Sequence, residues 1–425
     1  MDLRALLVAY YFPPSVDAGA KRALGFFRHL SAHGVAPQLV TVRDGNYATV
    51  PGDPWTDPPG VVRVDEERWP WQRGAPAGRA ESAADTQRAG GGLARRVVRE
   101  ALYVPDPWRG FHAPSLAAAR RLHAERAFDV VWTTSSPWTS LRTGAVLAQG
   151  GLPWVADLRD LWSANQYGST HSPARRALDR RLERRWLARA AAVTVTTEGQ
   201  AERVRALGLD VPVHVVRNGY LERAPLEPPP RARDGRVHVV FAGKVYAHAE
   251  HGVGPLLGAL AALRDLAPQA TERVHVDFYG RVEPAFASAV HAAGLGRAVT
   301  FHGLVARDVA THALRAADAA LVLMPAAHRE IVVTKLYDAF GALVPVLFVG
   351  PPDGEAAALV RDTGAGGVFA PADARGIATW LRDLADATPE DTARRAARAE
   401  SVAPYSYDAL AAELAAVLRG VASPR

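Results

Sequence analysis

The chain contains no cysteine among its 425 residues. Disulfide bonds, thiolate catalysis and zinc sites with cysteine ligands are therefore excluded. No apolar run approaches the roughly 18 residues that a membrane-spanning helix needs. Residues 1–9 are too short, and lack the small-residue cleavage site, for a signal peptide. We interpret them as the start of a buried strand and expect a cytoplasmic protein.

Several short motifs are also missing. The first strand–helix turn has no Gly-x-Gly-x-x-Gly, which argues against a nicotinamide or flavin site, so no cofactor is expected. There is no Gly-x-x-x-x-Gly-Lys-Ser/Thr phosphate loop and no Gly-x-Ser-x-Gly nucleophile turn. No Asp-x-Asp follows a strand, and we therefore expect no metal site.

Charge and length set broader limits. Lys and Arg total 50 against 44 Asp and Glu, a net charge of +6. This mild excess could serve anionic nucleotides, an anionic lipid surface or a nucleic acid. It is also a common result of an Arg- and Ala-rich composition, which we favour, and we expect no nucleic-acid partner. The length is sufficient for two domains with separate cores.

Alternating strands and helices predict a parallel α/β architecture in both halves. The first half, residues 1–221, opens with a strand (3–10), a helix (21–33) and a second strand (37–42). Its segment 43–112 is rich in Gly and Pro and is predicted to be an irregular insertion. Aromatic rings stack well on sugar faces, so its four tryptophans either form part of a ligand site or only pack the insertion. They are Trp55, Trp69, Trp71 and Trp108.

A second set of alternating elements follows a break in the pattern. Residues 222–236 are Pro-rich and charged, and we interpret them as a linker. Strands are predicted at 237–242, 274–279, 319–323 and 346–349, with helices between them. This alternation over 237–404 predicts a second doubly wound domain. The last segment, 405–425, contains a predicted helix over about 406–419.

The segment 328–346 holds the best candidate for a ligand site. We predict a helix over about 333–342 that is ended by Gly341 and Pro345. Val333 and Thr334 then lie at an N-terminus whose free N–H groups suit a phosphate. Lys335 adds a full charge, Glu330 lies just before the helix, and Asp338 could hold a diol such as a ribose. The alternative is an ordinary strand–loop–helix with a charged entrance.

A second cluster of charges follows the predicted strand 154–156. Asp157, Arg159, Asp160 and Trp162 come next in the sequence, and ligands of open α/β sheets collect at the carboxyl ends of strands. We interpret these residues, with Trp138 after the preceding strand, as a second part of an active site. An internal Asp–Arg ion pair that holds the loop is the alternative.

The helix predicted over 172–190 is rich in arginine. Such a helix could lie on an anionic membrane. Its apolar positions also form one stripe that could simply face the core. Peripheral membrane contact therefore stays an open alternative.

The segment 328–346 resembles the donor-binding signature of the retaining GT-B glycosyltransferases of glycosyltransferase family 4. In that signature a Glu is followed, eight positions later, by a second Glu and then by Gly-x-Pro-Val. Glu330 and Asp338 occupy the two acidic positions, and Pro345 and Val346 end the pattern. Asp338 stands where the family has Glu.

Other short segments resemble the same family in the same order. Gly19 and Arg22 resemble its N-terminal glycine loop near the donor pyrophosphate. Gly243 and Lys244 resemble the Gly-Arg pair after the first strand of its second domain. The loop 301–305, with His302 and Leu304, resembles the site where the nucleotide base is bound, and Gly280 lies in the loop before it.

The resemblance implies a fold and an activity. It implies a GT-B fold, with two Rossmann-like domains facing a cleft and the last helix crossing back to the first domain. It implies transfer of a hexosyl group, with retention, from a UDP- or GDP-sugar to a sugar, lipid-linked or small-molecule acceptor, for example in bacterial polysaccharide or natural-product synthesis. The residues implied for catalysis are Asp157, Asp160 and Glu330. Those expected on the acceptor side are Arg159, Trp138 and Trp162.

Two alternatives stay open at this point. One is another GT-B enzyme, such as a nucleotide-sugar epimerase or an enzyme that forms a non-glycosidic bond. The other is a degenerate partner subunit that only binds a nucleotide sugar. The departures Asp338 for Glu, His251 for Lys and Leu221 for Asp motivate the second alternative.

Overall fold

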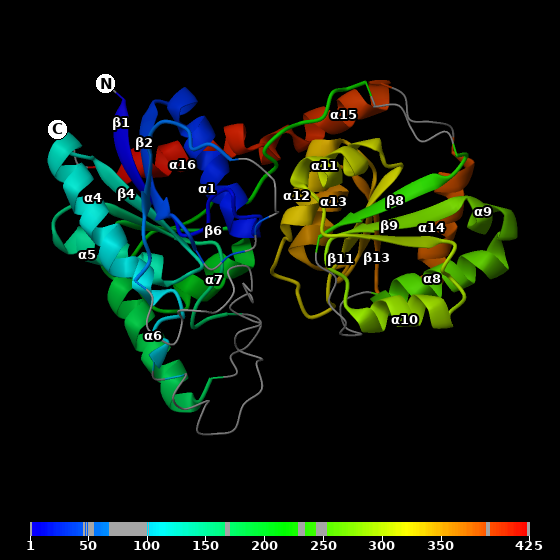
Figure 1. Cartoon of the computed structure of the whole chain (residues 1–425), viewed down its shortest axis with the longest axis horizontal. Coiled ribbons are helices and arrows are strands. Elements are labelled where there is room, and N and C mark those ends of the chain that lie inside the picture. The colour runs from blue at the N-terminus through cyan, green and yellow to red at the C-terminus, as the bar shows by residue number, and fades with distance from the viewer. Residues whose placement is uncertain are drawn as a thin grey trace. The chain divides into compact units, whose positions relative to one another are not determined.

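The chain folds into two compact units in this computed structural model (Figure 1). The structure describes residues 2–45, 47, 49, 55–67, 100, 102–165, 171–227, 234–243, 253–387 and 392–422. Unit 1 comprises Met1–Asn218 and Tyr407–Arg425, and unit 2 comprises Gly219–Ser406. Across the described ranges, no helix has both the length and the apolar character needed to cross a bilayer.

Unit 1 is built on a parallel sheet in the order β3-β2-β1-β4-β5-β6-β7. Its inner strands are largely buried on both faces, which explains their runs of Val, Leu and Ala. The strands are β1 (Leu3–Val8), β2 (Val35–Val42), β3 (Val61–Val64), β4 (Val130–Ser135), β5 (Trp154–Leu158), β6 (Ala192–Val195) and β7 (Val213–Val215).

Helices cover both faces of this sheet. They are α1 (Ala18–His29), α4 (His112–Arg126), α5 (Thr139–Gln149), α6 (Pro173–Leu187), α7 (Glu198–Arg205) and α16 (Tyr407–Val421), with short 3-10 turns at Leu30–His33 and Arg109–Phe111. The C-terminal helix α16, red in Figure 1, packs against α1. The ring of Tyr407 meets that of Phe26 edge-on at 5.4 Å.

Unit 2 has a second parallel sheet, in the order β10-β9-β8-β11-β12-β13. The strands are β8 (Val237–Ala242), β9 (Val274–Tyr279), β10 (Val299–Gly303), β11 (Ala319–Leu323), β12 (Val346–Val349) and β13 (Gly366–Phe369). The helices are α8 (Val253–Leu266), α9 (Pro268–Arg273), α10 (Pro284–Ala292), α11 (Arg307–Ala316), α12 (Thr334–Ala342), α13 (Glu355–Asp362), α14 (Ala374–Asp386) and α15 (Thr392–Val402). The predicted fold class, with two doubly wound domains and a returning last helix, is confirmed.

Two local predictions differ from the structure. The segment predicted to be irregular contains the edge strand β3, which pairs with β2. Gly341 does not end α12 but lies inside it, where a Cβ would come within 2.8 Å of the carbonyl oxygen of Glu222 and the Cβ of Tyr220. This glycine therefore makes room for the segment that enters unit 2, and Leu343, with φ of 57°, ends the helix.

Candidate functional site

In each sheet, successive strands are first added on one side of the first strand and then on its other side. The point where the side changes lies between β1 and β4 in unit 1, and between β8 and β11 in unit 2. Ligands of open α/β sheets bind beyond the carboxyl ends of the strands at such points. We therefore examine these two strand ends, each within its own unit.

Three neighbouring strands of unit 2 end in glycines. Gly243 follows β8, Gly280 follows β9, and Gly303 ends β10. The Gly243 amide donates to the carbonyl oxygen of Tyr279 at 2.7 Å, and the Gly280 amide donates to that of Gly303 at 2.7 Å. A Cβ on Gly280 would lie 2.3 Å from the Gly243 carbonyl oxygen. These glycines therefore allow the ends of the neighbouring strands to pack closely against one another.

Lys335 lies directly beside this row of glycines. Its Cε lies 2.2 Å from the position that a Cβ on Gly243 would take. Its Nζ lies 4.9 Å from the centre of the Phe241 ring, a cation–π distance. The fold thus brings together three residues predicted to bind the donor: Gly243, Gly280 and Lys335.

The start of α12 adds a partial positive charge to this site. Val333 caps the helix without a side-chain hydrogen bond to the first turn. Glu330 lies partly buried in the preceding loop, which is held by the bond from the Glu355 amide to the Arg329 carbonyl oxygen at 2.8 Å. Asp338 lies one turn beyond Thr334 on the same face of α12. Lys244 lies outside the described residues.

The predicted base-binding loop is supported by residues that we did not predict. The rings of His302 and Tyr279 stack at 4.1 Å, and Nε2 of His302 donates to Oδ1 of Asp277 at 2.7 Å. His238 Nδ1 donates to the other Asp277 oxygen at 2.8 Å. Burial alone would raise the pKa of Asp277, but these hydrogen bonds outweigh it and lower that pKa. Leu304 is 45% exposed.

A period-two pattern could have revealed this support. His275, Asp277 and Tyr279 alternate along β9 and therefore lie on one face of the sheet. A buried Asp in an otherwise apolar strand indicates a partner on the next strand. In the described parts of the chain, no cluster of three or more His, Asp or Glu side chains is arranged to hold a metal ion.

In unit 1, Asp157 lies inside a strand and not at its end. We predicted that the strand stops at Ala156, but β5 continues to Leu158. Asp157 is therefore paired with Thr134 of β4 and Thr194 of β6, and both hydroxyls donate to its carboxylate at 2.6 Å. Its exposed fraction is 0%.

Arg22 is the charged partner of Asp157. Its Nε and Nη2 donate to the two carboxylate oxygens at 2.9 and 2.6 Å. The remaining N–H groups donate to the carbonyl oxygens of Val216 and Arg217 and to Oδ1 of Asn218. All five guanidinium N–H groups thus have acceptors.

These contacts change two predicted roles. Arg22 has no N–H group left for a donor phosphate, and Asp157 has no exposed oxygen for an acceptor hydroxyl. The predicted alternative of an internal Asp–Arg ion pair describes Asp157 better, although its partner is Arg22 and not Arg159. Through these bonds the pair connects α1, β5 and the segment 216–218.

Asp160 and Arg159 lie in a different setting. Arg159 Nη2 contacts Asp160 Oδ2 at 2.8 Å, and their side chains are 13% and 38% exposed. Gly19 lies under the guanidinium, because a Cβ there would be 3.2 Å from Nη2. The Asp160 carbonyl oxygen accepts from Ser135 at 3.3 Å, which fixes the loop and leaves the carboxylate at the surface. Asp160 is thus the accessible acid of this strand end.

The predicted acceptor-side tryptophans are buried. Trp138 and Trp162 are 4% and 5% exposed and stack on each other at 5.9 Å. Trp138 Nε1 donates to the Asp160 carbonyl oxygen at 3.4 Å. These two rings therefore support the loop from behind, and neither offers a free face to a sugar.

The tryptophans of the predicted insertion divide into two groups. Trp108 is 2% exposed and packs in the core, whereas Trp55 is partly exposed and contacts Phe12. The packing alternative thus describes Trp108. Trp69 and Trp71 lie outside the described residues.

Two buried carboxylates that we did not predict fix the start of α5 and the loop after β5. Asp106, between two prolines, accepts from the amide and hydroxyl of Thr139 at 2.8 and 2.7 Å and so caps the start of α5. Burial raises its pKa to about 6. Glu183 of α6 accepts from the amide of Ser163 at 3.0 Å, and burial raises its pKa to about 7. An Asp flanked by Pro was a usable signal for Asp106, but no local pattern marks Glu183.

Comparison with known proteins agrees with this fold. Residues 18–219 match the family model described as a glycosyl transferase 4-like domain. A comparison with curated proteins finds no significant match.

Similar solved structures cover nearly the whole chain. Sucrose-phosphate synthase from Thermosynechococcus elongatus has a TM-score of 0.64 at 17% identity, over 98% of both chains. HepE from Anabaena, in complex with UDP-glucose, has a TM-score of 0.60 at 14% identity, over 98% of this chain and 100% of its own. The E. coli structure described as trehalose-6-phosphate bound with UDP-2-fluoro glucose has a TM-score of 0.61 at 13% identity, over 99% of this chain and 100% of its own. Residues 18–219 are therefore similar to a glycosyl transferase 4-like domain, and the chain as a whole has the GT-B fold.

Proposed function

We propose that the protein transfers a sugar from a nucleotide-sugar donor to an acceptor hydroxyl, with retention at the anomeric carbon and without a metal ion. The observation that carries this proposal is the contact between Lys335 and the glycine row at the strand ends of unit 2. Two structures similar to this chain hold UDP-glucose or UDP-2-fluoro glucose, which supports a nucleotide-sugar donor.

The chemical task is to stabilise a departing diphosphate. Gly243 makes room for the Lys335 side chain at these strand ends. Lys335 and the N-terminus of α12 then supply the positive charge that the phosphates need. Lys335 is one of only three lysines in an arginine-rich chain, with Lys21 and Lys244. A compact ammonium acts on a phosphate as a point charge and needs no planar partner.

The remaining groups orient the two substrates. We assign the stacked pair of His302 and Tyr279 to the base, Asp338 to the ribose and Glu330 to the donor sugar. In unit 1 the accessible Asp160, beside Arg159, is the group that orients the acceptor hydroxyl or takes its proton.

Donor binding is the direct test. The melting temperature would be measured with UDP, GDP, TDP and ADP, first without metal and then with magnesium. We expect one nucleotide to stabilise the protein by about 2 kcal/mol or more near saturation, equally with and without magnesium. Lys335→Met keeps the aliphatic stem that packs on Phe241 but removes the charge, and it should abolish most of this stabilisation. Lys21→Met removes the same charge from unit 1 and should not.

Turnover separates the enzyme from a binding subunit. Binding of one nucleotide, together with release of the nucleoside diphosphate from the corresponding sugar donor, would support a transferase. Binding without any turnover would favour the degenerate partner subunit. No stabilisation by any of the four nucleotides would remove the donor-site assignment.

A further inference from the structure

The outer face of α6 carries positive charge without acidic residues. The two carboxylates of this helix point inward: Asp179 is 4% exposed and accepts from Arg175 Nε at 2.8 Å, and Glu183 is 1% exposed and accepts from Ser163. Five arginines of α6 are exposed, namely Arg176, Arg180, Arg181, Arg184 and Arg185. Within the described ranges no carboxylate pairs with any of the five.

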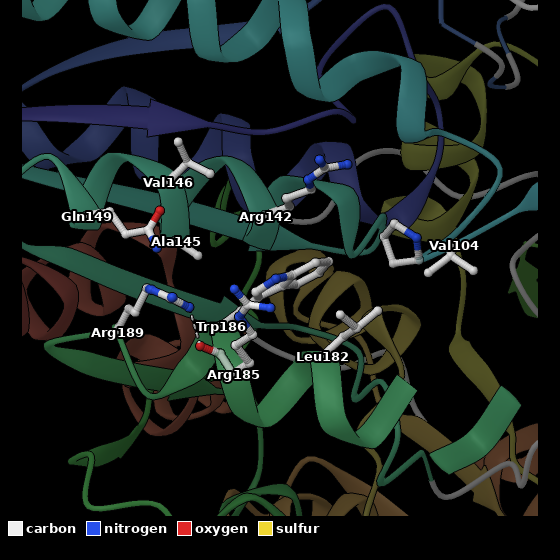
Figure 2. Close-up of a pocket in the computed structure, with 10 residues that line it drawn as sticks. Val104, Arg142, Ala145, Val146, Gln149, Leu182, Arg185, Trp186 and Arg189 are labelled. Carbon is white, nitrogen blue, oxygen red and sulfur yellow. Dashed lines mark hydrogen bonds between the residues drawn. The ribbon is translucent and has the colours of Figure 1, made fainter. Parts of the chain in front are cut away.

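A pocket of about 350 Å³ lies between α5 and α6 beside this face (Figure 2). Its charged lining consists of Arg142 from α5, Arg185 from α6, and Arg189 just after α6. With its amide oxygen turned toward Arg189, Gln149 accepts from Nη2 and Nε at 2.8 and 3.0 Å. No acid of the described residues neutralises these three arginines.

The rest of the pocket is apolar. Val146 of α5 and Leu182 and Trp186 of α6 line it, together with Val104 and Pro105. Leu178, one turn before Leu182, is 41% exposed on the same helix. Guanidinium groups next to an indole ring and aliphatic side chains match a ligand that joins an anionic group to an apolar body.

We propose that this pocket binds the phosphate headgroup of an anionic phospholipid, and that the outer face of α6 docks on an anionic bilayer. The arginines meet the headgroup phosphates. Leu178, Leu182 and Trp186 lie against the apolar boundary of the bilayer, which suits an indole with one apolar side. A nucleic acid would satisfy the arginines but would leave these apolar side chains without partners.

The pocket also adjoins the candidate acceptor loop of the same unit. Trp186 lies 5.1 Å from Trp162, and Trp162 stacks on Trp138, whose Nε1 donates to Asp160. A lipid in the pocket would therefore contact the outer end of a row of rings that supports Asp160. Binding at the pocket is nevertheless independent of the proposed transfer reaction.

The test compares vesicles of phosphatidylcholine with vesicles that also contain about one third phosphatidylglycerol. The full chain should sediment with the anionic vesicles only. Replacing both pocket arginines, in Arg142→Ala with Arg185→Ala, should weaken vesicle binding about tenfold or more. The matched control, Arg176→Ala with Arg180→Ala, also removes two positive charges, but from the part of α6 outside the pocket. It should weaken vesicle binding about threefold or less.

A second measurement isolates the pocket from the bilayer. Dihexanoyl phosphatidylglycerol, below its micellar concentration, should bind the wild-type chain and the control variant but not the pocket variant. Each variant should keep its wild-type melting temperature, which shows that unit 1 is folded.

Four results would overturn the proposal. They are equal binding to neutral vesicles, no binding to either kind, equal losses in the two variant pairs, and tighter binding to single-stranded RNA than to anionic vesicles. Stabilisation by inorganic phosphate, without any binding of the short-chain lipid, would likewise overturn the proposal, because the pocket would then be a simple anion site. None of these readouts uses the nucleotide-sugar donor, so they are separate from the test of the proposed function.

Discussion

The side chain of Lys335 occupies the space that any side chain at position 243 would need. Its Cε lies 2.2 Å and its Nζ 3.0 Å from an ideal Cβ on Gly243. Gly243 also has φ of 139°, a conformation that residues other than glycine rarely adopt. The glycine at the end of β8 therefore determines where the ammonium group lies.

Gly243→Ala should displace this ammonium and weaken nucleotide binding. We expect the stabilisation by the preferred nucleotide to fall to a small fraction of its wild-type value, as judged by the shift in melting temperature at one fixed nucleotide concentration. The control is Gly364→Ala, because Gly364 also has positive φ, 60°, but has nothing within 4 Å of its Cβ position. If both variants lose nucleotide binding equally, backbone strain and not the Lys335 contact is responsible.

Asp157→Asn should destabilise the protein without acting on chemistry. The amide leaves the buried Arg22 guanidinium without its counter-charge, and breaking a buried ion pair costs about 3–5 kcal/mol. Urea denaturation would measure this loss. Asp65→Asn is the control, because the Asp65 side chain is 81% exposed in its pair with Arg43, and it should leave the free energy of unfolding nearly unchanged. A stable Asp157→Asn protein with lost turnover would restore the catalytic role that we first predicted.

Asp160→Asn should lower turnover and leave the stability of the protein nearly unchanged. The Asp160 carboxylate is 38% exposed, so its pair with Arg159 contributes little to stability. Because this carboxylate orients or deprotonates the acceptor in our proposal, the substitution should lower turnover by a factor of about 100 or more. Release of nucleoside diphosphate from the donor would be measured alongside nucleotide binding. Unchanged turnover in a folded Asp160→Asn variant would remove this residue from the mechanism.

The contrast between these two aspartates shows where sequence reasoning succeeded and where it failed. Short apolar runs bounded by Gly or Pro located most strands, and β9, β11 and β12 have the predicted bounds. β5 was ended too early, because we interpreted Asp157 as the first residue of the loop. Asp157 continues the strand because Thr134, Thr194 and Arg22 satisfy it, and none of the three is local in sequence.

The candidate donor site could be predicted in outline for a related reason. Its helix start, Lys335 and the two acidic residues lie within one short segment, so their spacing is visible in the sequence. The contact between Lys335 and Gly243 depends on the sheet order, which places β8 next to β11. Asp277 and Tyr279 were missed because they support His302 from a neighbouring strand.

Glu183 should make stability depend on pH. Burial raises its pKa from 4.5 to about 7, so the folded protein keeps a proton that the unfolded chain has lost between these values. The free energy of unfolding should therefore fall as the pH rises from about 4.5 to about 7, by roughly 3 kcal/mol from this group. Above pH 7 this contribution is constant.

Glu183→Gln should reduce that dependence, because an amide does not titrate. Urea denaturation at pH 5 and pH 8 would compare the two proteins in the same buffers, so that other groups such as Asp106 contribute equally to both. We expect the wild type to lose more stability than the variant between these two pH values. Equal losses would mean that Glu183 is ionised throughout this range.

Gly25→Ala should loosen the C-terminal helix from α1. An added Cβ would lie 2.2 Å from Cγ of Tyr407, whose buried ring fills the space above Gly25 and packs edge-on against Phe26. Such overpacking costs about 1–3 kcal/mol, measured by urea denaturation. The control is Gly420→Ala in α16, where nothing lies within 4 Å of the Cβ position and an alanine should stabilise the helix slightly. If Gly25→Ala is as stable as the wild type, the ring of Tyr407 is not held against α1 in solution, and the returning helix is anchored by its other contacts, such as Asp408 with His33 at 3.0 Å.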